Sequence, residues 1–238
     1  MFFLTELLGT LTMVLLGNGV IANVLLDRSK GQNSGWIVVT AGWACAVMCG
    51  TQVACALGGP GWLNPALALA GLFRPGPGPG AVLAAVAGEF AGAFLGAVLV
   101  FLGYRPHWAA TADPDLKLAV FATGPAIRNA PANCLTEAIA TFVLVLLLLA
   151  IRSLPAGSGI LPLATGGLVW GLGLSLGGPT AFAMNPARDL GPRLAHALLP
   201  IPGKGPSDWG YAWIPVVAPL VGGLAGIVTW LLATRAPI

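Results

Sequence analysis

The fold is decided by two related stretches, residues 58–80, GGPGWLNPALALAGLFRPGPGPG, and residues 177–194, GGPTAFAMNPARDLGPRL. We call them the first and second signature segments. Each is interrupted by glycine and proline yet stays apolar, and each contains Asn-Pro-Ala, at Asn64-Pro65 and at Asn185-Pro186. Asparagine is a favoured helix N-cap and proline suits the next position, so each motif predicts the start of a helix.

These two short helices predict a junction in the middle of a membrane. Helices of about ten residues are ~15 Å long, so two that meet N-terminus to N-terminus cover the ~30 Å hydrocarbon core. The junction places two positive dipole ends at mid-membrane. Once the oxygens of Asn64 and Asn185 have capped their helices, we expect both NH2 groups to stay free, as four N–H donors. Such a site holds a neutral oxygen, repels cations and prevents bound water from relaying protons.

Apolar segments surround the signature segments along the whole chain. Hydrophobic residues make up 57% of the 238 residues and charged residues only 8%, whereas about a quarter of a soluble domain is charged. The apolar runs predict six membrane spans, approximately over residues 3–26, 35–57, 81–103, 132–152, 160–177 and 209–233. The predicted fold class is an all-α membrane protein with six transmembrane helices and two half-helices.

The spacing of the signature segments indicates an internal repeat, because they stand about half the chain apart. Each half contains three spans, an odd number, so the halves enter the membrane with opposite orientation, as in the inverted repeats of transport proteins. We predict one transmembrane channel domain, residues 1–238, with a first repeat at 1–110 and a second at 132–238. The polar stretch 104–131 is interpreted as an extramembrane loop that connects the halves, with His107 solvated in it.

Composition and motifs exclude several classes of function. The eleven basic and eight acidic residues form no basic cluster, which argues against a nucleic-acid partner. No nucleophile with a base, metal cluster or phosphate-binding glycine loop is apparent, so we expect no enzyme, no cofactor and no metal site. The four cysteines form no CxxC motif, and no disulfide is assigned.

Loop charges and small residues bear on topology and assembly. With six spans both termini lie on one side, where the loops carry Arg74, Arg152 and Arg235, and the positive-inside rule makes that side cytoplasmic. Runs rich in glycine and alanine at residues 87–97 and 217–226 predict close helix packing, which would suit an oligomer.

The stretches GWLNPALALAG and AFAMNPARDLGPR resemble the signature loops of the major intrinsic protein family, the aquaporins and glycerol facilitators. The resemblance extends over essentially the whole chain. It implies a multi-pass channel of the cell membrane with cytoplasmic termini, assembled as a homotetramer with one pore per subunit. The first segment departs from the family, because Pro60-Gly61-Trp62 stands where a small residue and a histidine usually precede Leu-Asn. The role of Trp62 is therefore open.

The resemblance also implies a narrowest point on the extracellular side, formed here by Trp43, Gly173, Phe182 and Arg188. Arg188 offers donors to hydroxyl oxygens, while Trp43 and Phe182 offer an apolar corner to a carbon backbone. Water-selective relatives usually have histidine where Gly173 stands, and glycine leaves room for a three-carbon polyol. The aspartate that follows this arginine, Asp189, also resembles the residue found there in the glycerol-conducting branch. The resemblance thus predicts a passive channel for glycerol and water that excludes ions and protons.

Four acidic residues in apolar surroundings need separate interpretation. Glu6 and Glu137 occupy repeat-related places, and we interpret them as scaffold groups that accept hydrogen bonds from the irregular backbone of the signature segments. Asp189 lies in the first turn of a half-helix, where its charge meets the positive dipole end, so a purely structural role competes. Glu89 stands where the family often has glutamine, and its role is open.

Three alternatives to this prediction stay open. A water-selective aquaporin is opposed mainly by Gly173 and Asp189. A proton-coupled secondary transporter would use Glu6, Glu89 and Glu137, and it would accumulate solute against a gradient. A structural membrane protein with a closed pore would pass no solute. The expected partners are glycerol, water, similar small neutral solutes and the lipid bilayer.

Overall fold

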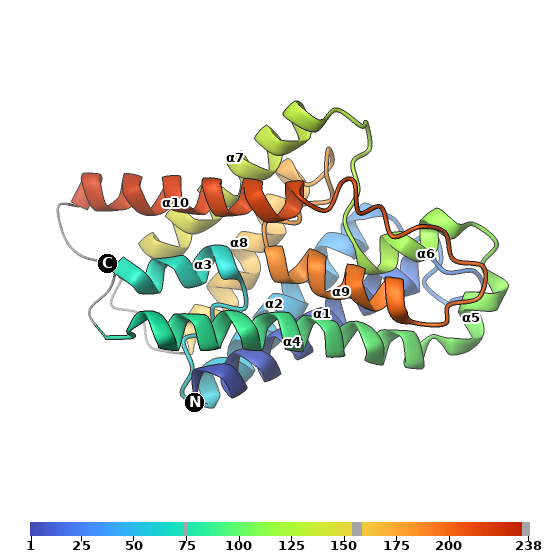
Figure 1. The fold of residues 1–238 in the computed structure, drawn as a ribbon, viewed down its shortest axis with the longest axis horizontal. Helices are drawn as coiled ribbons and strands as arrows, with labels where there is room; N and C mark the ends of the chain where they lie inside the picture. The colour runs from blue at the N-terminus through green and yellow to red at the C-terminus, as the bar shows by residue number, and fades with distance from the viewer. Residues whose placement is uncertain (74–75, 154–158, 235–238) are drawn as a thin grey trace.

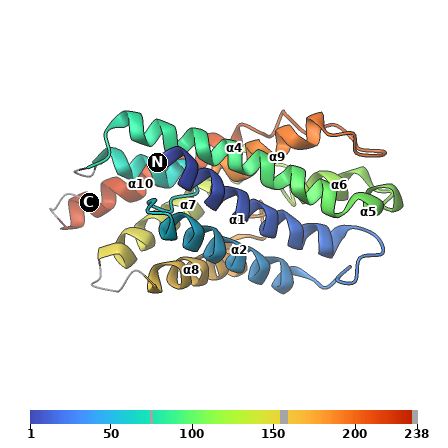
Figure 2. The ribbon, with the colours of Figure 1, turned by 90° about the horizontal axis from the view of Figure 1, so that it is seen from below.

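The computed structural model describes residues 1–73, 76–153 and 159–234. Within these residues the elements are, in chain order, α1 (Phe2–Leu25), α2 (Trp36–Ala56), α3 (Pro65–Ala68), the 3-10 helix η1 (Leu69–Phe73), α4 (Pro79–Gly103), α5 (Arg105–Ala110), α6 (Pro114–Phe121), α7 (Ala130–Ser153), α8 (Ile160–Leu176), α9 (Pro186–Leu198) and α10 (Ile214–Thr234). The long helices run along one axis, with α1 between α2 and α4 and with α8 beside α2 (Figure 2). The start of α1 and the end of α10 lie toward the same end of that axis (Figure 1).

Five helices of the described chain are long and apolar enough to cross a membrane, namely α1, α2, α4, α7 and α10. The sixth predicted span corresponds to α8, which has only 17 residues and is therefore about 25 Å long. That length lies at the lower limit for a membrane-crossing helix. Arg74 and Arg235, two of the residues that suggest the orientation, lie outside the described residues.

Small residues bring pairs of these helices into close contact within the chain. A Cβ atom on Gly88 would lie 2.2 Å from the carbonyl oxygen of Phe3, and one on Gly92 would lie 2.2 Å from that of Leu7. These glycines, four residues apart on α4, thus form a stripe on which α1 rests. The run at 217–226 has the same role, because a Cβ on Gly222 of α10 would lie 2.1 Å from the Ala138 oxygen of α7. Both runs therefore serve packing within the chain.

The two half-helices lie in line between α4 and α10, α3 toward one end of the molecule and α9 toward the other (Figure 1). The first is α3 continued by η1, and the second is the 13-residue α9. Their N-termini face each other, as the capping contacts below establish. The predicted half-helix starts at Pro65 and Pro186 are confirmed.

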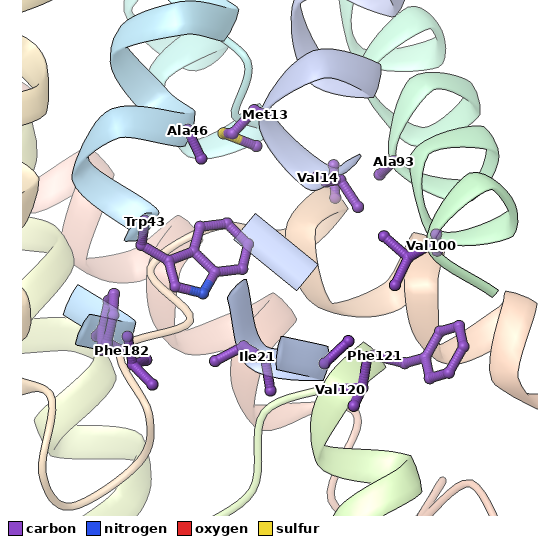
Figure 3. Close-up of a cluster of buried hydrophobic side chains, with 14 of the residues drawn as sticks. Met13, Val14, Ile21, Trp43, Ala46, Ala93, Val100, Val120, Phe121 and Phe182 are labelled. Atoms are coloured by element: carbon purple, nitrogen blue, oxygen red, sulfur yellow. The ribbon is translucent and has the colours of Figure 1, made fainter. Parts of the chain in front are cut away.

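The connection 104–131 is partly helical and partly buried, and His107 is less exposed than the solvated side chain that the sequence predicted. The segment contains α5 and α6, and Trp108 and Phe121 are completely buried. Figure 3 shows Val120 and Phe121 of α6 below Val100 of α4, in one cluster of buried side chains. His107 is half-buried and its Nδ1 lies 2.9 Å from the carbonyl oxygen of Asp27. Apolar residues spaced within an otherwise polar stretch fold this connection back onto the bundle.

Candidate functional site

The asparagine junction is built from two helix caps. Asn64 Oδ1 accepts a hydrogen bond from the Ala66 amide at 2.9 Å. Asn185 Oδ1 accepts from the amides of Ala187 at 3.0 Å and Arg188 at 3.1 Å. Pro65 and Pro186 occupy the first helical positions, where the absent N–H would have had no partner within the helix.

The amide groups of the two asparagines link the signature segments. Asn64 Nδ2 donates to the carbonyl oxygen of Met184 at 2.8 Å, and Asn185 Nδ2 donates to that of Leu63 at 2.7 Å. The expectation that both NH2 groups stay free was therefore wrong. Each group has two hydrogens and uses one of them across the junction, which leaves two donors in place of the expected four. The reciprocal bonds hold the two helix starts together at a defined separation.

Both asparagines line a narrow cavity, the middle cavity, of about 50 Å³. A second, large cavity of about 670 Å³ opens beyond it. Three residues line both cavities and so form the boundary between them, namely Trp43, Phe182 and Arg188. We call this set the arginine constriction. The boundary consists of three of the four residues that the sequence analysis assigned to the narrowest point.

The arginine constriction combines a fixed cation with two aromatic faces. The guanidinium carbon of Arg188 lies 4.0 Å from the centre of the Trp43 ring, and its Nη1 donates to the carbonyl oxygen of Phe121 at 3.3 Å. Trp43 rests on Gly17, where a Cβ would lie 2.5 Å from the indole. Figure 3 shows Trp43 extending from α2 into the interior, with Phe182 of the second signature segment near it. The guanidinium keeps further donors for a passing solute.

Known proteins resemble this chain over nearly its whole length. A model of the family described as major intrinsic protein matches residues 2–230. The chain belongs to the major intrinsic protein family. This member of the family is 51% identical over 235 residues to the "Probable glycerol uptake facilitator protein" of Thermotoga maritima, with 96% of this chain and 98% of the relative covered. It is 47% identical over 227 residues to the glycerol uptake facilitator protein of Streptococcus pneumoniae, with 95% and 97% covered.

A solved structure extends the comparison to three dimensions. The aquaglyceroporin from Plasmodium falciparum superposes with a TM-score of 0.85 at 26% identity, covering 98% of both chains. The family and the apolar helices together make this chain an integral membrane protein.

Gly173 lies next to Phe182 of the arginine constriction in this major intrinsic protein. It does not belong to the described lining of the large or the middle cavity. A Cβ on Gly173 would lie 3.0 Å from Thr40 Cγ2 and 3.3 Å from Phe182 Cζ. Thr40 and the ring of Phe182 thus border the space beside this glycine, and the place of Gly173 at the narrowest point stays a prediction.

Two buried carboxylates hold the signature segments in this family member. Glu137 Oε1 accepts from Thr180 Oγ1 at 2.6 Å and from the Ala183 amide at 2.9 Å, and its Oε2 accepts from the Met184 amide at 2.8 Å. Glu6 accepts from the amides of Trp62 at 3.2 Å and Leu63 at 2.6 Å. Glu89 of α4 is completely buried next to Glu6. Backbone amides of both signature segments therefore donate hydrogen bonds to buried carboxylates.

Asp189 belongs to a buried network that the sequence analysis did not assign. Its Oδ2 accepts from the amide and the hydroxyl of Thr123, at 2.8 and 2.6 Å. Arg193, also completely buried, donates to both carboxylate oxygens at 2.8 and 3.0 Å and to the carbonyls of Thr123 and Ser207. This network holds the end of α6, and with it the Phe121 carbonyl, beside Arg188. The spacing of Asp189 and Arg193, four residues apart on one helix, was the only signal for it in the sequence.

Proposed function

We propose that this chain is a passive channel for glycerol and water. The observation that carries the proposal is the arginine constriction, where a buried guanidinium lies over the Trp43 ring and shares the boundary of two cavities with Phe182. Glycerol has hydroxyl oxygens along one side and a carbon backbone along the other, and the constriction offers donors to the first and an apolar surface to the second. Relatives named glycerol uptake facilitators support this solute.

Exclusion of ions and protons is part of the same proposal. Arg188 is a cation at the constriction, and the N-termini of α3 and α9 bring two positive dipole ends to the junction. A cation would meet repulsion at both points. The two remaining asparagine N–H groups donate to a water oxygen and orient its hydrogens away, which interrupts a proton-conducting chain.

The hydrogen bonds of the buried acids favour a channel over a proton-coupled transporter. Glu6 and Glu137 accept bonds from the backbone of the signature segments. A proton-coupling group would have to give up such bonds in each cycle, at a cost of about 1–3 kcal/mol for each buried donor left without a partner. Glu6 and Glu137 are proposed to act as scaffold groups, and the protein to be neither an enzyme nor a proton-coupled transporter.

We also propose that the chain assembles as a homotetramer in the cell membrane, with both termini in the cytoplasm. The halves 1–110 and 132–238 are proposed to form an inverted repeat, which the facing half-helices support. Native mass spectrometry in detergent measures the assembly state. Labelling of a cysteine added at either end with a membrane-impermeant maleimide measures the orientation.

Stopped-flow light scattering on proteoliposomes tests the function directly. A sucrose shock reports water efflux, and a glycerol shock reports shrinkage followed by re-swelling, each compared with empty vesicles. Fast flux of both solutes, with no accumulation of glycerol under a proton gradient, is expected. Fast water flux with excluded glycerol would favour a water-selective aquaporin. Accumulation against a gradient would favour a transporter, and absence of any flux a closed structural protein.

A further inference from the structure

A second boundary lies on the other side of the asparagine junction. The middle cavity adjoins a small cavity of about 20 Å³. Three residues line both, namely Trp62, Leu67 and Leu148, and we call them the tryptophan collar. A volume of this size has room for about one water molecule. The collar therefore borders a space that holds about one water molecule.

The collar differs in chemistry from the arginine constriction. Its three side chains are apolar except for one indole N–H, and the small cavity beyond is lined by Ala70, Val145, Leu149 and Arg152 together with the collar residues. The two carbonyls that precede Trp62, those of Pro60 and Gly61, already accept hydrogen bonds from Arg152 at 3.0 and 3.4 Å. The collar thus offers a carbon backbone an apolar surface and offers water few partners.

The indole of Trp62, which belongs to the collar, is held on several sides. Its Cη2 and Cζ2 atoms would lie 2.6 and 2.8 Å from a Cβ on Gly71, so the ring lies directly on this glycine. The ring of Phe2 lies 5.9 Å away, centre to centre. The Trp62 amide is bonded to Glu6. Because backbone and ring are both fixed, the collar is a permanent feature of the path.

We propose that Trp62 is a specificity-determining residue, which with Leu67 and Leu148 slows water relative to three-carbon polyols. This inference rests on the proposed function of the chain as a solute channel. A water molecule in an apolar constriction loses hydrogen bonds to its neighbours and gains none from the wall, so it crosses slowly. A polyol replaces part of that loss with contacts between its carbon atoms and the collar. The arginine constriction selects by a charged donor, and the collar selects by its lack of polar partners.

Substitution of Trp62 by histidine and by phenylalanine tests the proposal. Trp62→His adds a donor and an acceptor to the collar and should raise the ratio of water to glycerol permeability about fivefold, because regaining one hydrogen bond at a barrier changes a rate by that order. Trp62→Phe keeps the collar apolar, so both permeabilities should change together. A ratio unchanged in Trp62→His, or raised equally in Trp62→Phe, would overturn the assignment.

A substitution at Gly71 changes the position of the Trp62 ring without changing any of the three collar residues. Gly71→Ala places a methyl group against the indole and should push the ring into the path, which lowers the flux of both solutes. Gly171→Ala on α8 is the matched control, since a Cβ there has nothing within 4 Å. In the Trp62→His background, Gly71→Ala should lose its effect. If Gly71→Ala behaves as the control does, the ring does not bound the path and the inference is wrong.

The same vesicles separate this inference from the proposed function. A wild-type protein that passes no glycerol refutes both. A wild-type protein that passes glycerol and water, with the ratio unmoved in Trp62→His, refutes the collar alone.

Discussion

Replacing Glu137 by glutamine tests how the second signature segment keeps its conformation. The Glu137 carboxylate accepts bonds from Thr180, Ala183 and Met184. The same stretch contains three residues other than glycine with positive φ, namely Ala181 at 60°, Phe182 at 40° and Met184 at 48°. Such conformations cost about 1–3 kcal/mol each and persist only where their surroundings enforce them. The hydrogen bonds to the carboxylate hold this strained backbone in place beside the arginine constriction.

Glutamine has one carbonyl oxygen where glutamate has two acceptors. If that oxygen stays on Thr180 and Ala183, the new NH2 group faces the Met184 amide, and one buried donor loses its partner at a cost of about 1–3 kcal/mol. For a chain of this length we expect the melting temperature to fall by about 2–10 °C. Release of Phe182 from its strained position should reduce glycerol permeability by about tenfold, which corresponds to ~1.4 kcal/mol in the barrier.

Differential scanning fluorimetry in detergent and stopped-flow flux in proteoliposomes measure the two effects. Glu6→Gln should be milder, because Glu6 serves a segment with one strained residue other than glycine, Leu63 at φ 53°. Glu89→Gln is the matched control, since it removes one of two neighbouring buried carboxyls and should leave both measurements near wild type. An effect of Glu137→Gln no larger than that of Glu89→Gln would refute the reasoning.

Three further outcomes follow from the geometry. Asn185→Asp adds a negative charge at the positive helix ends and should produce a cation current in planar bilayers, and unchanged conductance would contradict the dipole argument. Gly173→His adds a side chain between Thr40, 3.0 Å from a Cβ there, and the Phe182 ring at 3.3 Å, next to the constriction. Glycerol flux should therefore fall more than water flux, and an equal fall would count against this assignment. Gly88→Ala pushes α1 away from α4, and this overpacking costs about 1–3 kcal/mol, so the melting temperature in detergent should fall by several degrees. Gly103→Ala should leave the melting temperature unchanged, because a Cβ there has nothing within 4 Å.

The sequence by itself determined the membrane class, the positions of the spans and the two half-helix starts. These features depend on local properties, namely the apolar length of a segment and the capping geometry of Asn-Pro. The scaffold role of Glu6 and Glu137 was also a reasonable prediction, because a carboxylate in an apolar helix needs nearby donors. The spans and the helix starts follow from neighbouring residues alone, whereas the scaffold role follows from the repeat-related places of the two glutamates.

Only the tertiary structure decided how those parts meet. Asn64 and Asn185 each use one hydrogen on the opposite segment, more than a hundred residues away, so the number of free donors could not be derived from either motif. Thr40 and the Phe182 ring border Gly173, and the carbonyl of Phe121 anchors Arg188. Such contacts join residues distant in the chain, and hydrophobic periodicity records which face of a helix is buried but not which partner covers it.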